Sequence, residues 1–326
     1  MAIVQLEAEV EGAGDIVLRN YADPASPRTA CSFAAGNHRV VQLIDARHVV
    51  IEHDFRYFAV VDLPDVRFHW FELPPDQEAS PTFLAVSPGL DQVLWMSTHV
   101  DTETSATDEV HITTSAGDHV VASWQRPLGG RCGDPDDSNP GAYTHSGAHA
   151  FVLSQVIRPQ NRLLVIEGET AVLSVLPPSE GWQAGSHPAM AVWSPTSETL
   201  YYRQGSDVWQ RTAGSDPEPF LEGVIWSHPT ITPDGNYLAY AVAREDGLHD
   251  VYLVDLAHDG SPQRIGESRN QPVFLNSTQL WYRTEGQGMC GPSGDEPRIY
   301  DVTDSMEFPS TISRVVAVWP ATSSNH

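Results

Sequence analysis

Short runs in which hydrophobic residues alternate with polar or small ones recur along this chain, and they predict β-strands. In residues 237–243 (YLAYAVA), Leu238, Tyr240 and Val242 alternate with alanines. Pro233-Asp234-Gly235 predicts a tight turn before this strand, because proline presets φ and glycine accepts a positive φ. Residues 244–247 (REDG) predict the next turn, and residues 251–256 a returning strand. The segment therefore predicts three strands joined by two turns.

The same plan recurs along the chain, which indicates a repeat architecture. Its turn positions are Asp54, Pro88, Pro159, Pro195, Pro233 and Asn276. Apart from one long interval, their spacing is close to the roughly 40–45 residues of a four-stranded propeller blade. The long interval contains residues 125–149, which are rich in Gly, Pro and Asp and predict a loop insertion without strands. We therefore expect one domain over residues 1–326, an all-β, six-bladed propeller of four-stranded antiparallel blades. A seventh blade would have to lie within the insertion.

Residues 228–256 (HPTITPDGNYLAYAVAREDGLHDVYLVDL) resemble the PD40, or TolB-like, β-propeller repeat. That repeat has the pattern P-x-W/I-S/T-P-D-G, then an apolar strand, then a D-x-Y/W-x-x-D/R strand. The resemblance is close here, partial in 187–212 and 80–114, and extends over about half the chain. It implies a ring closed by strands from both termini, with residues 2–10 or 15–19 pairing with 311–319. Closure removes exposed sheet edges.

The charge balance narrows the range of partners. All 18 basic residues are arginines, and against 43 acidic residues they leave a net charge of −25. Nucleic acids and anionic membrane surfaces are bound through basic contacts, so neither is expected as a partner. No apolar stretch is long enough to span a bilayer. The N-terminus lacks the basic region of a signal peptide, so we expect a cytoplasmic location. We also expect the protein to be soluble and monomeric. A secreted or periplasmic location would require a signal removed beforehand.

Several chemistries are excluded by missing residues or motifs. The absence of lysine excludes Schiff-base and pyridoxal phosphate chemistry, and there is no G-x-S-x-G, Walker or Rossmann motif. Cys31, Cys132 and Cys290 have no zinc-site spacing. Three free thiols are one interpretation, and a disulfide between Cys132 and Cys290 is another. Asp134, Asp136 and Asp137 do not match a calcium-binding EF-hand, because Asn139 stands where glycine is required.

Candidate site residues lie where the chain enters the innermost strand of each predicted blade, since propellers bind ligands at the channel mouth. His149, His187, His228 and Gln271 occupy such positions in four consecutive repeats. No cofactor is certain, but neutral imidazoles with a glutamine oxygen could bind a divalent metal such as manganese, zinc or calcium. In the alternative interpretation, a histidine before proline only caps backbone groups at the start of a blade.

Aromatic and insertion residues add to this candidate site. Trp182 and Trp226 lie just upstream of His187 and His228 and could stack on a sugar, or could instead pack between blades. Arg131 and Tyr143 lie in the long insertion, together with His149, and could cover the channel as a lid.

Two classes of function remain. The first is a module that binds a small molecule, a glycan or a protein at the channel mouth. The second is a metal-dependent or histidine-assisted lyase, hydrolase or isomerase that uses His149, His187 and His228. Repeat type and histidine placement are similar to those of propeller lyases that cleave uronic-acid oligosaccharides at a manganese site. With six blades, this chain would be one blade shorter than we expect for those lyases.

Overall fold

The computed structural model of this protein consists of strands and turns, with no helix in the part of the chain that it describes. The structure describes the backbone of the strands named below and the side chains of residues 48–51, 58–62, 85–87, 89–125, 191–258, 260–285, 296–312 and 315. Within these described parts, no helical segment has the length and hydropathy needed to cross a bilayer.

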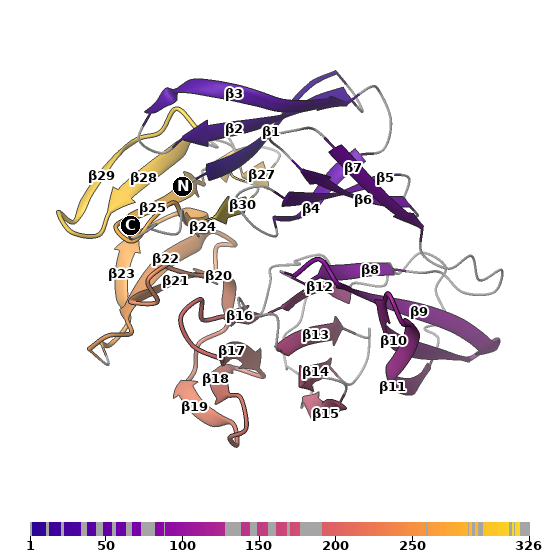
Figure 1. The fold of residues 1–326 in the computed structure, drawn as a ribbon. Coiled ribbons are helices and arrows are strands. Elements are labelled where there is room, and N and C mark those ends of the chain that lie inside the picture. The colour runs from indigo at the N-terminus through magenta and orange to yellow at the C-terminus, as the bar shows by residue number, and fades with distance from the viewer. Residues whose placement is uncertain are drawn as a thin grey trace, which may run out of the picture.

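In the described part of the chain, seven four-stranded antiparallel sheets are arranged around a ring (Figure 1). The terminal sheet contains β1 (Ala2–Val10), β2 (Ala13–Asn20), β3 (Asp23–Phe33) and β30 (Ala317–Trp319). The next sheet contains β4 (His38–Leu43), β5 (His48–His53), β6 (Tyr57–Asp62) and β7 (Arg67–Glu72). It is followed by β8 (Thr82–Val86), β9 (Gln92–Thr102), β10 (Ser105–Thr114) and β11 (Gly117–Pro127). The fourth sheet contains β12 (Ser138–Tyr143), β13 (His149–Gln155), β14 (Asn161–Glu167) and β15 (Thr170–Leu176).

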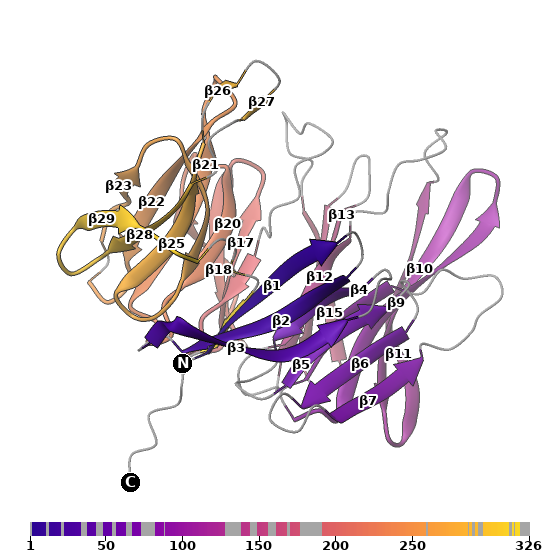
Figure 2. The ribbon, with the colours of Figure 1, turned by 90° about the horizontal axis from the view of Figure 1, so that it is seen from above.

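The remaining sheets complete the ring. The fifth contains β16 (Ala191–Trp193), β17 (Thr199–Gln204), β18 (Asp207–Thr212) and β19 (Glu218–Leu221). The sixth contains β20 (Trp226–Ile231), β21 (Tyr237–Ala243), β22 (His249–Asp255) and β23 (Gln263–Gly266). The seventh contains β24 (Arg269–Phe274), β25 (Gln279–Thr284), β28 (Pro297–Asp301) and β29 (Met306–Pro309). A two-stranded extension, β26 (Gln287–Gly288) and β27 (Gly291–Pro292), projects from this last sheet (Figure 2).

The two ends of the chain meet in one sheet. β1 pairs antiparallel with β30, with Ala2 opposite Trp319 and Val4 opposite Ala317. Closure by the termini is therefore confirmed. The count of six blades is not confirmed, because each of the six repeats forms its own sheet and the terminal strands form a seventh. Residues 1–33 contain none of the turn positions on which the repeats are aligned, so the sequence predicts these strands only as closing strands.

The insertion at residues 125–149 was also predicted wrongly as free of strands. β11 extends to Pro127, β12 spans Ser138–Tyr143, and β13 begins at His149. β12 pairs with β13 despite its Asn-Pro-Gly sequence, with a register shift between Asn139 and Ala142. A bulge accommodates glycine and proline within an edge strand, which explains why composition alone was misleading here.

The turn between the first two strands of a blade has the same geometry in three sheets. The backbone N–H of Ser87, Ser194 and Thr232 donates to the carbonyl five residues later, at 2.8–3.0 Å. All three hydroxyl residues are buried. The repeat register predicted from the turns is confirmed in these sheets.

Among the described residues, part of the core lies between neighbouring sheets. Tyr201 and Val208 of the fifth sheet pack in one cluster with Trp226 and Tyr240 of the sixth. Ala239 and Val251 of the sixth sheet pack in another with residues of the seventh. The fifth, sixth and seventh sheets therefore bury apolar faces against one another, as neighbouring units do in other repeat folds.

Candidate functional site

His228 and Gln271 occupy equivalent positions in adjacent blades, as the repeat alignment predicted. Each lies in the first strand of its sheet, directly before a proline, at a bulge in the pairing with the second strand. Their φ values are +49° and +55°. A residue other than glycine pays a cost of roughly 1–3 kcal/mol in such a conformation, and strained residues of this kind cluster at ligand sites. The shared conformation marks the start of these inner strands as a candidate site.

Four polar side chains gather where the sixth and seventh sheets meet, and we call them the histidine–glutamate cluster: His228, His249, Asn270 and Glu285. The backbone N–H of His249 donates to Glu285 Oε2 at 2.6 Å, and His249 Nδ1 lies 3.0 Å from Glu285 Oε1. Asn270 Nδ2 donates to Glu285 Oε1 at 2.8 Å. The side-chain oxygen of Asn270 accepts from the backbone N–H of Gln271 at 2.7 Å, which ties the cluster to the strained position.

His228 is held in its neutral form. Burial lowers the pKa of His228 to about 4, with a further lowering from neighbouring His249 that Glu285 partly offsets. Its Nδ1 atom is buried and has no hydrogen-bond partner among the described residues. An unsatisfied buried polar atom is costly, and such atoms in native structures commonly indicate a missing ligand or a functional role.

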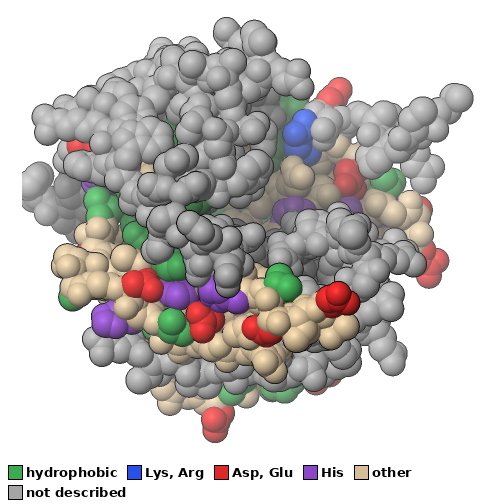
Figure 3. All heavy atoms as spheres, turned by 90° about the vertical axis from the view of Figure 1, so that its right-hand side faces the viewer, with side chains coloured by type: hydrophobic (Ala, Val, Ile, Leu, Met, Phe, Trp, Pro, Cys, Tyr) green, Lys and Arg blue, Asp and Glu red, His purple; other side chains and the backbone are tan. Residues whose placement is uncertain are grey.

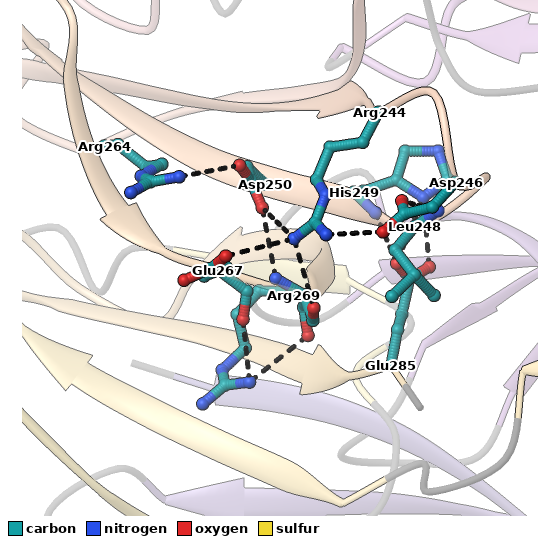
Figure 4. A network of polar contacts seen from close by, with 10 residues as sticks. Arg244, Asp246, Leu248, His249, Asp250, Arg264, Glu267, Arg269 and Glu285 are labelled. Atoms are coloured by element: carbon teal, nitrogen blue, oxygen red, sulfur yellow. Dashed lines mark hydrogen bonds and ion pairs between the residues drawn. The ribbon is translucent and has the colours of Figure 1, made fainter. Parts of the chain in front are cut away.

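An ion-pair network fixes the backbone around the cluster (Figure 4). Asp250 is 5% exposed and accepts from Arg244 Nη1 at 3.4 Å, Arg264 Nη1 at 3.2 Å and the backbone N–H of Ser268 at 3.1 Å. Arg244 also pairs with Asp246 and with Glu267. Asp250 directly follows His249, and Ser268 is two residues before Asn270. The network therefore ties the sixth sheet to the segment that leads into β24, beside the cluster.

The other predicted site residues fall into two groups. Gln271 is exposed at the start of β24. Trp226 is 0% exposed and packs against Tyr240, with ring centroids 5.7 Å apart. Trp226 is thus a core residue in this structure, and the expectation that it stacks on a ligand is not met. Packing between blades, the other interpretation of its position, is what the structure shows, and the sequence left the choice open because nearness to His228 gave no information about the face of β20 on which Trp226 lies.

Several predicted residues lie outside the described residues. These are His187, Trp182, Arg131 and the cysteines Cys132 and Cys290. For His149 and Tyr143 the structure describes only the backbone, in β13 and β12. Among the described residues, no group of three or more His, Cys, Asp or Glu side chains is arranged to hold a metal ion. The manganese, zinc or calcium site remains a prediction that depends on His149 and His187.

The sequence did not single out His249, Asn270 or Glu285. Asn270 directly precedes the predicted Gln271, and this was a usable signal. His249 and Glu285 are 36 residues apart in sequence, and only the contact between sheets brings them together.

No family model matches the sequence, and no curated protein sequence matches it. The chain is similar in fold to a prolyl endopeptidase, with a TM-score of 0.58 and 12% identity over 95% of this chain. It spans about half the length of that protein, 49%. It is also similar to oligogalacturonate lyase from Vibrio parahaemolyticus, with a TM-score of 0.57 and 10% identity over 87% of this chain and 88% of the lyase.

A third similar structure is an oligogalacturonate lyase in complex with manganese, with a TM-score of 0.52 and 10% identity over 94% of this chain and 84% of the lyase. At these identities the similarities establish the fold. The chain is a β-propeller, as its PD40-like repeats implied.

Proposed function

We propose that this propeller binds a small hydroxyl-rich molecule, such as a neutral glycan, at the start of its inner strands β20 and β24. The observation that carries the proposal is the neutral, half-buried His228, whose buried Nδ1 atom has no hydrogen-bond partner among the described residues and whose pKa is influenced by the charge of Glu285. A ligand hydroxyl can donate to or accept from an imidazole nitrogen, and its binding would relieve an unsatisfied polar group.

The chemistry of the cluster favours hydroxyl groups over charged ones. Glu285 supplies a carboxylate and Asn270 an amide, and these are groups that hydrogen-bond to sugar hydroxyls. The Glu285 carboxylate and the net charge of −25 oppose anionic ligands. A site built on strands that the ion-pair network holds in place is also preorganised, which lowers the entropic cost of binding.

A second candidate is a histidine-assisted lyase, and the neutral state of His228 is the observation that favours it. A neutral imidazole can accept a proton at physiological pH, although a pKa of about 4 makes it a weak base. The solved structures of similar fold include oligogalacturonate lyases, one of them with manganese. In this candidate, His228 would hold a divalent metal together with Gln271, His149 and His187. We rank it second because a weak base supplies little driving force.

Calorimetric titration with neutral and uronic-acid oligosaccharides tests both candidates. For the binding proposal we expect a neutral oligosaccharide to bind, and we expect Glu285→Gln to weaken binding by about tenfold, because hydrogen bonds to a charged group contribute about 1.5–3 kcal/mol. His258→Ala is the control, because its side chain is 81% exposed and lies outside the cluster. Lack of binding to any neutral oligosaccharide, or binding unchanged by Glu285→Gln, would refute the proposal. Release of unsaturated products from uronic-acid oligosaccharides would favour the lyase instead.

A further inference from the structure

A chain of hydrogen bonds links three strands on one face of the β8–β11 sheet, away from the histidine–glutamate cluster. Ser97 Oγ lies 3.0 Å from His111 Nε2. His111 Nδ1 lies 2.7 Å from Asp118 Oδ2. Figure 3 views the side of the molecule on which this sheet lies and shows histidine and acidic side chains next to one another. The order of atoms is that of a serine nucleophile, a histidine base and an orienting carboxylate.

Strand register produces this arrangement. Trp95 pairs with His111 and Ser97 pairs with Glu109, so the side chains of 95, 97, 109 and 111 share one face of the sheet. Ser97 and His111 are diagonal neighbours on that face, within reach of long side chains. The pairing of β10 with β11 shifts in register after Val110, and Asp118 of β11 lies opposite Thr113 of β10. The strand that carries His111 therefore lies between the strand that carries Ser97 and the strand that carries Asp118.

Asp118 is held ionised and His111 is held in one orientation. Burial alone would raise the pKa of Asp118, but hydrogen bonds from Thr113 and His111 outweigh it and keep that pKa below its usual value. Thr113 Oγ1 donates to Asp118 Oδ1 at 2.6 Å. The His111 ring stacks on Trp95 with centroids 3.9 Å apart. An ionised Asp118 favours the hydrogen on His111 Nδ1, so Nε2 is left to accept from the Ser97 hydroxyl.

We propose that Ser97, His111 and Asp118 form a nucleophilic triad that hydrolyses small uncharged esters. Ser97 Oγ bonds to the ester carbonyl carbon as its proton passes to His111 Nε2. His111 then gives this proton to the leaving alkoxide as the ester C–O bond breaks. Water attacks the acyl-serine, its proton passes through His111 to Ser97, and the carboxylic acid leaves. Asp118 is the positioning residue, and His99 Nε2, 3.3 Å from Ser97 Oγ, is a donor for the oxyanion.

The surroundings of Ser97 define the class of substrate. Ser97 is 2% exposed, so a substrate must reach it past the neighbouring side chains, and we expect only a small acyl group to do so. The side chains of His99 and Glu109, which are 32% and 29% exposed, border the approach. Glu109 Oε2 lies 3.8 Å from His111 Nε2, and its charge opposes anionic esters. A short-chain, uncharged ester is therefore the expected substrate.

The test is labelling of the folded full-length protein with a small fluorophosphonate, followed by intact mass and peptide mapping. We expect one adduct, on Ser97, in the wild type and in His119→Ala, a control on the same strand as Asp118 whose side chain is exposed. We expect no adduct at this site in Ser97→Ala. Asp118→Asn, compared with the wild type at a temperature where both proteins are folded, should label at least about a hundredfold more slowly, because a general base contributes roughly 10²–10⁴-fold.

Two results would overturn the proposal. The first is a folded wild-type protein with no adduct on Ser97 at high probe concentration, which does not depend on the stability of any variant. The second is a labelling rate that stays the same in a folded Asp118→Asn protein. Either would show that the hydrogen-bond chain only stabilises the blade.

Discussion

Replacing His228 with glutamine should change how the stability of this protein depends on pH. Glutamine already occupies the equivalent left-handed position at Gln271, directly before a proline, so the substitution suits the local backbone. It removes a group that binds a proton at pH 6.5 in the unfolded chain but only at about pH 4 in the folded protein. The cause is burial of the imidazole, aided by His249.

The direction and the size of the change in stability follow from the difference between the pKa of His228 in the folded protein and in the unfolded chain. Between about pH 6.5 and 4 the unfolded chain binds a proton at His228 that the folded protein does not, so the folded state loses stability as the pH falls. The stability that is lost through protonation of His228 is fully present above pH 6.5. At about 1.4 kcal/mol per pH unit, the wild type should lose about 3 kcal/mol between pH 7 and pH 4 through His228 alone. His228→Gln should lack this part of the loss.

Reversible urea unfolding, followed by tryptophan fluorescence at several pH values from 7 to 4, measures the effect. The free energy of unfolding of His228→Gln minus that of the wild type should rise by about 3 kcal/mol as the pH falls, because titrations common to both proteins cancel. His119→Gln, at an exposed histidine, is the matched control. If the curves of the wild type and His228→Gln remain parallel, His228 is not held neutral and the argument for the site fails.

Two further predictions concern packing between sheets. Gly235→Ala should destabilise by about 2–3 kcal/mol, because φ is +75° and a Cβ atom would lie 2.2 Å from Thr196 Oγ1. Gly247→Ala, with φ of +81° and open space around it, should lose only about 1 kcal/mol of stability. If Gly235→Ala and Gly247→Ala lower the midpoint of urea unfolding equally, the steric argument is contradicted. Trp226→Ala should lose about 3–5 kcal/mol because the side chain is fully buried, and a loss below about 1 kcal/mol in the same assay would show that it is not a core residue.

Much of the fold was predictable from short-range patterns. The strands of the sixth sheet, its Pro-Asp-Gly turn and the recurrence of that unit followed from alternation and turn residues. The pairing of residues 2–4 with residues 317–319 agreed with the expected closure. The number of sheets did not follow, because β1–β3 contain none of the aligned turn positions and β12 lies in a segment whose composition disfavours strands.

The candidate site was only partly predictable. The equivalence of His228 and Gln271 followed from their spacing to the turns. Their left-handed backbone did not, because the bulges at Ser227/Thr230 and Asn270/Val273 are features of strand pairing. The choice between stacking and packing for Trp226 stayed open for a related reason, since the face on which a strand residue lies depends on its pairing register.

By itself, the sequence determined the all-β class, the repeat unit, the strongly acidic surface and the exclusion of lysine chemistry. These properties depend on residue identities and on neighbours within one or two turns. The tertiary structure decided the seventh sheet, the burial of Trp226, the histidine–glutamate cluster and the Ser97–His111–Asp118 chain. Each of these depends on which strands lie side by side, and that choice is made by packing between residues far apart in sequence.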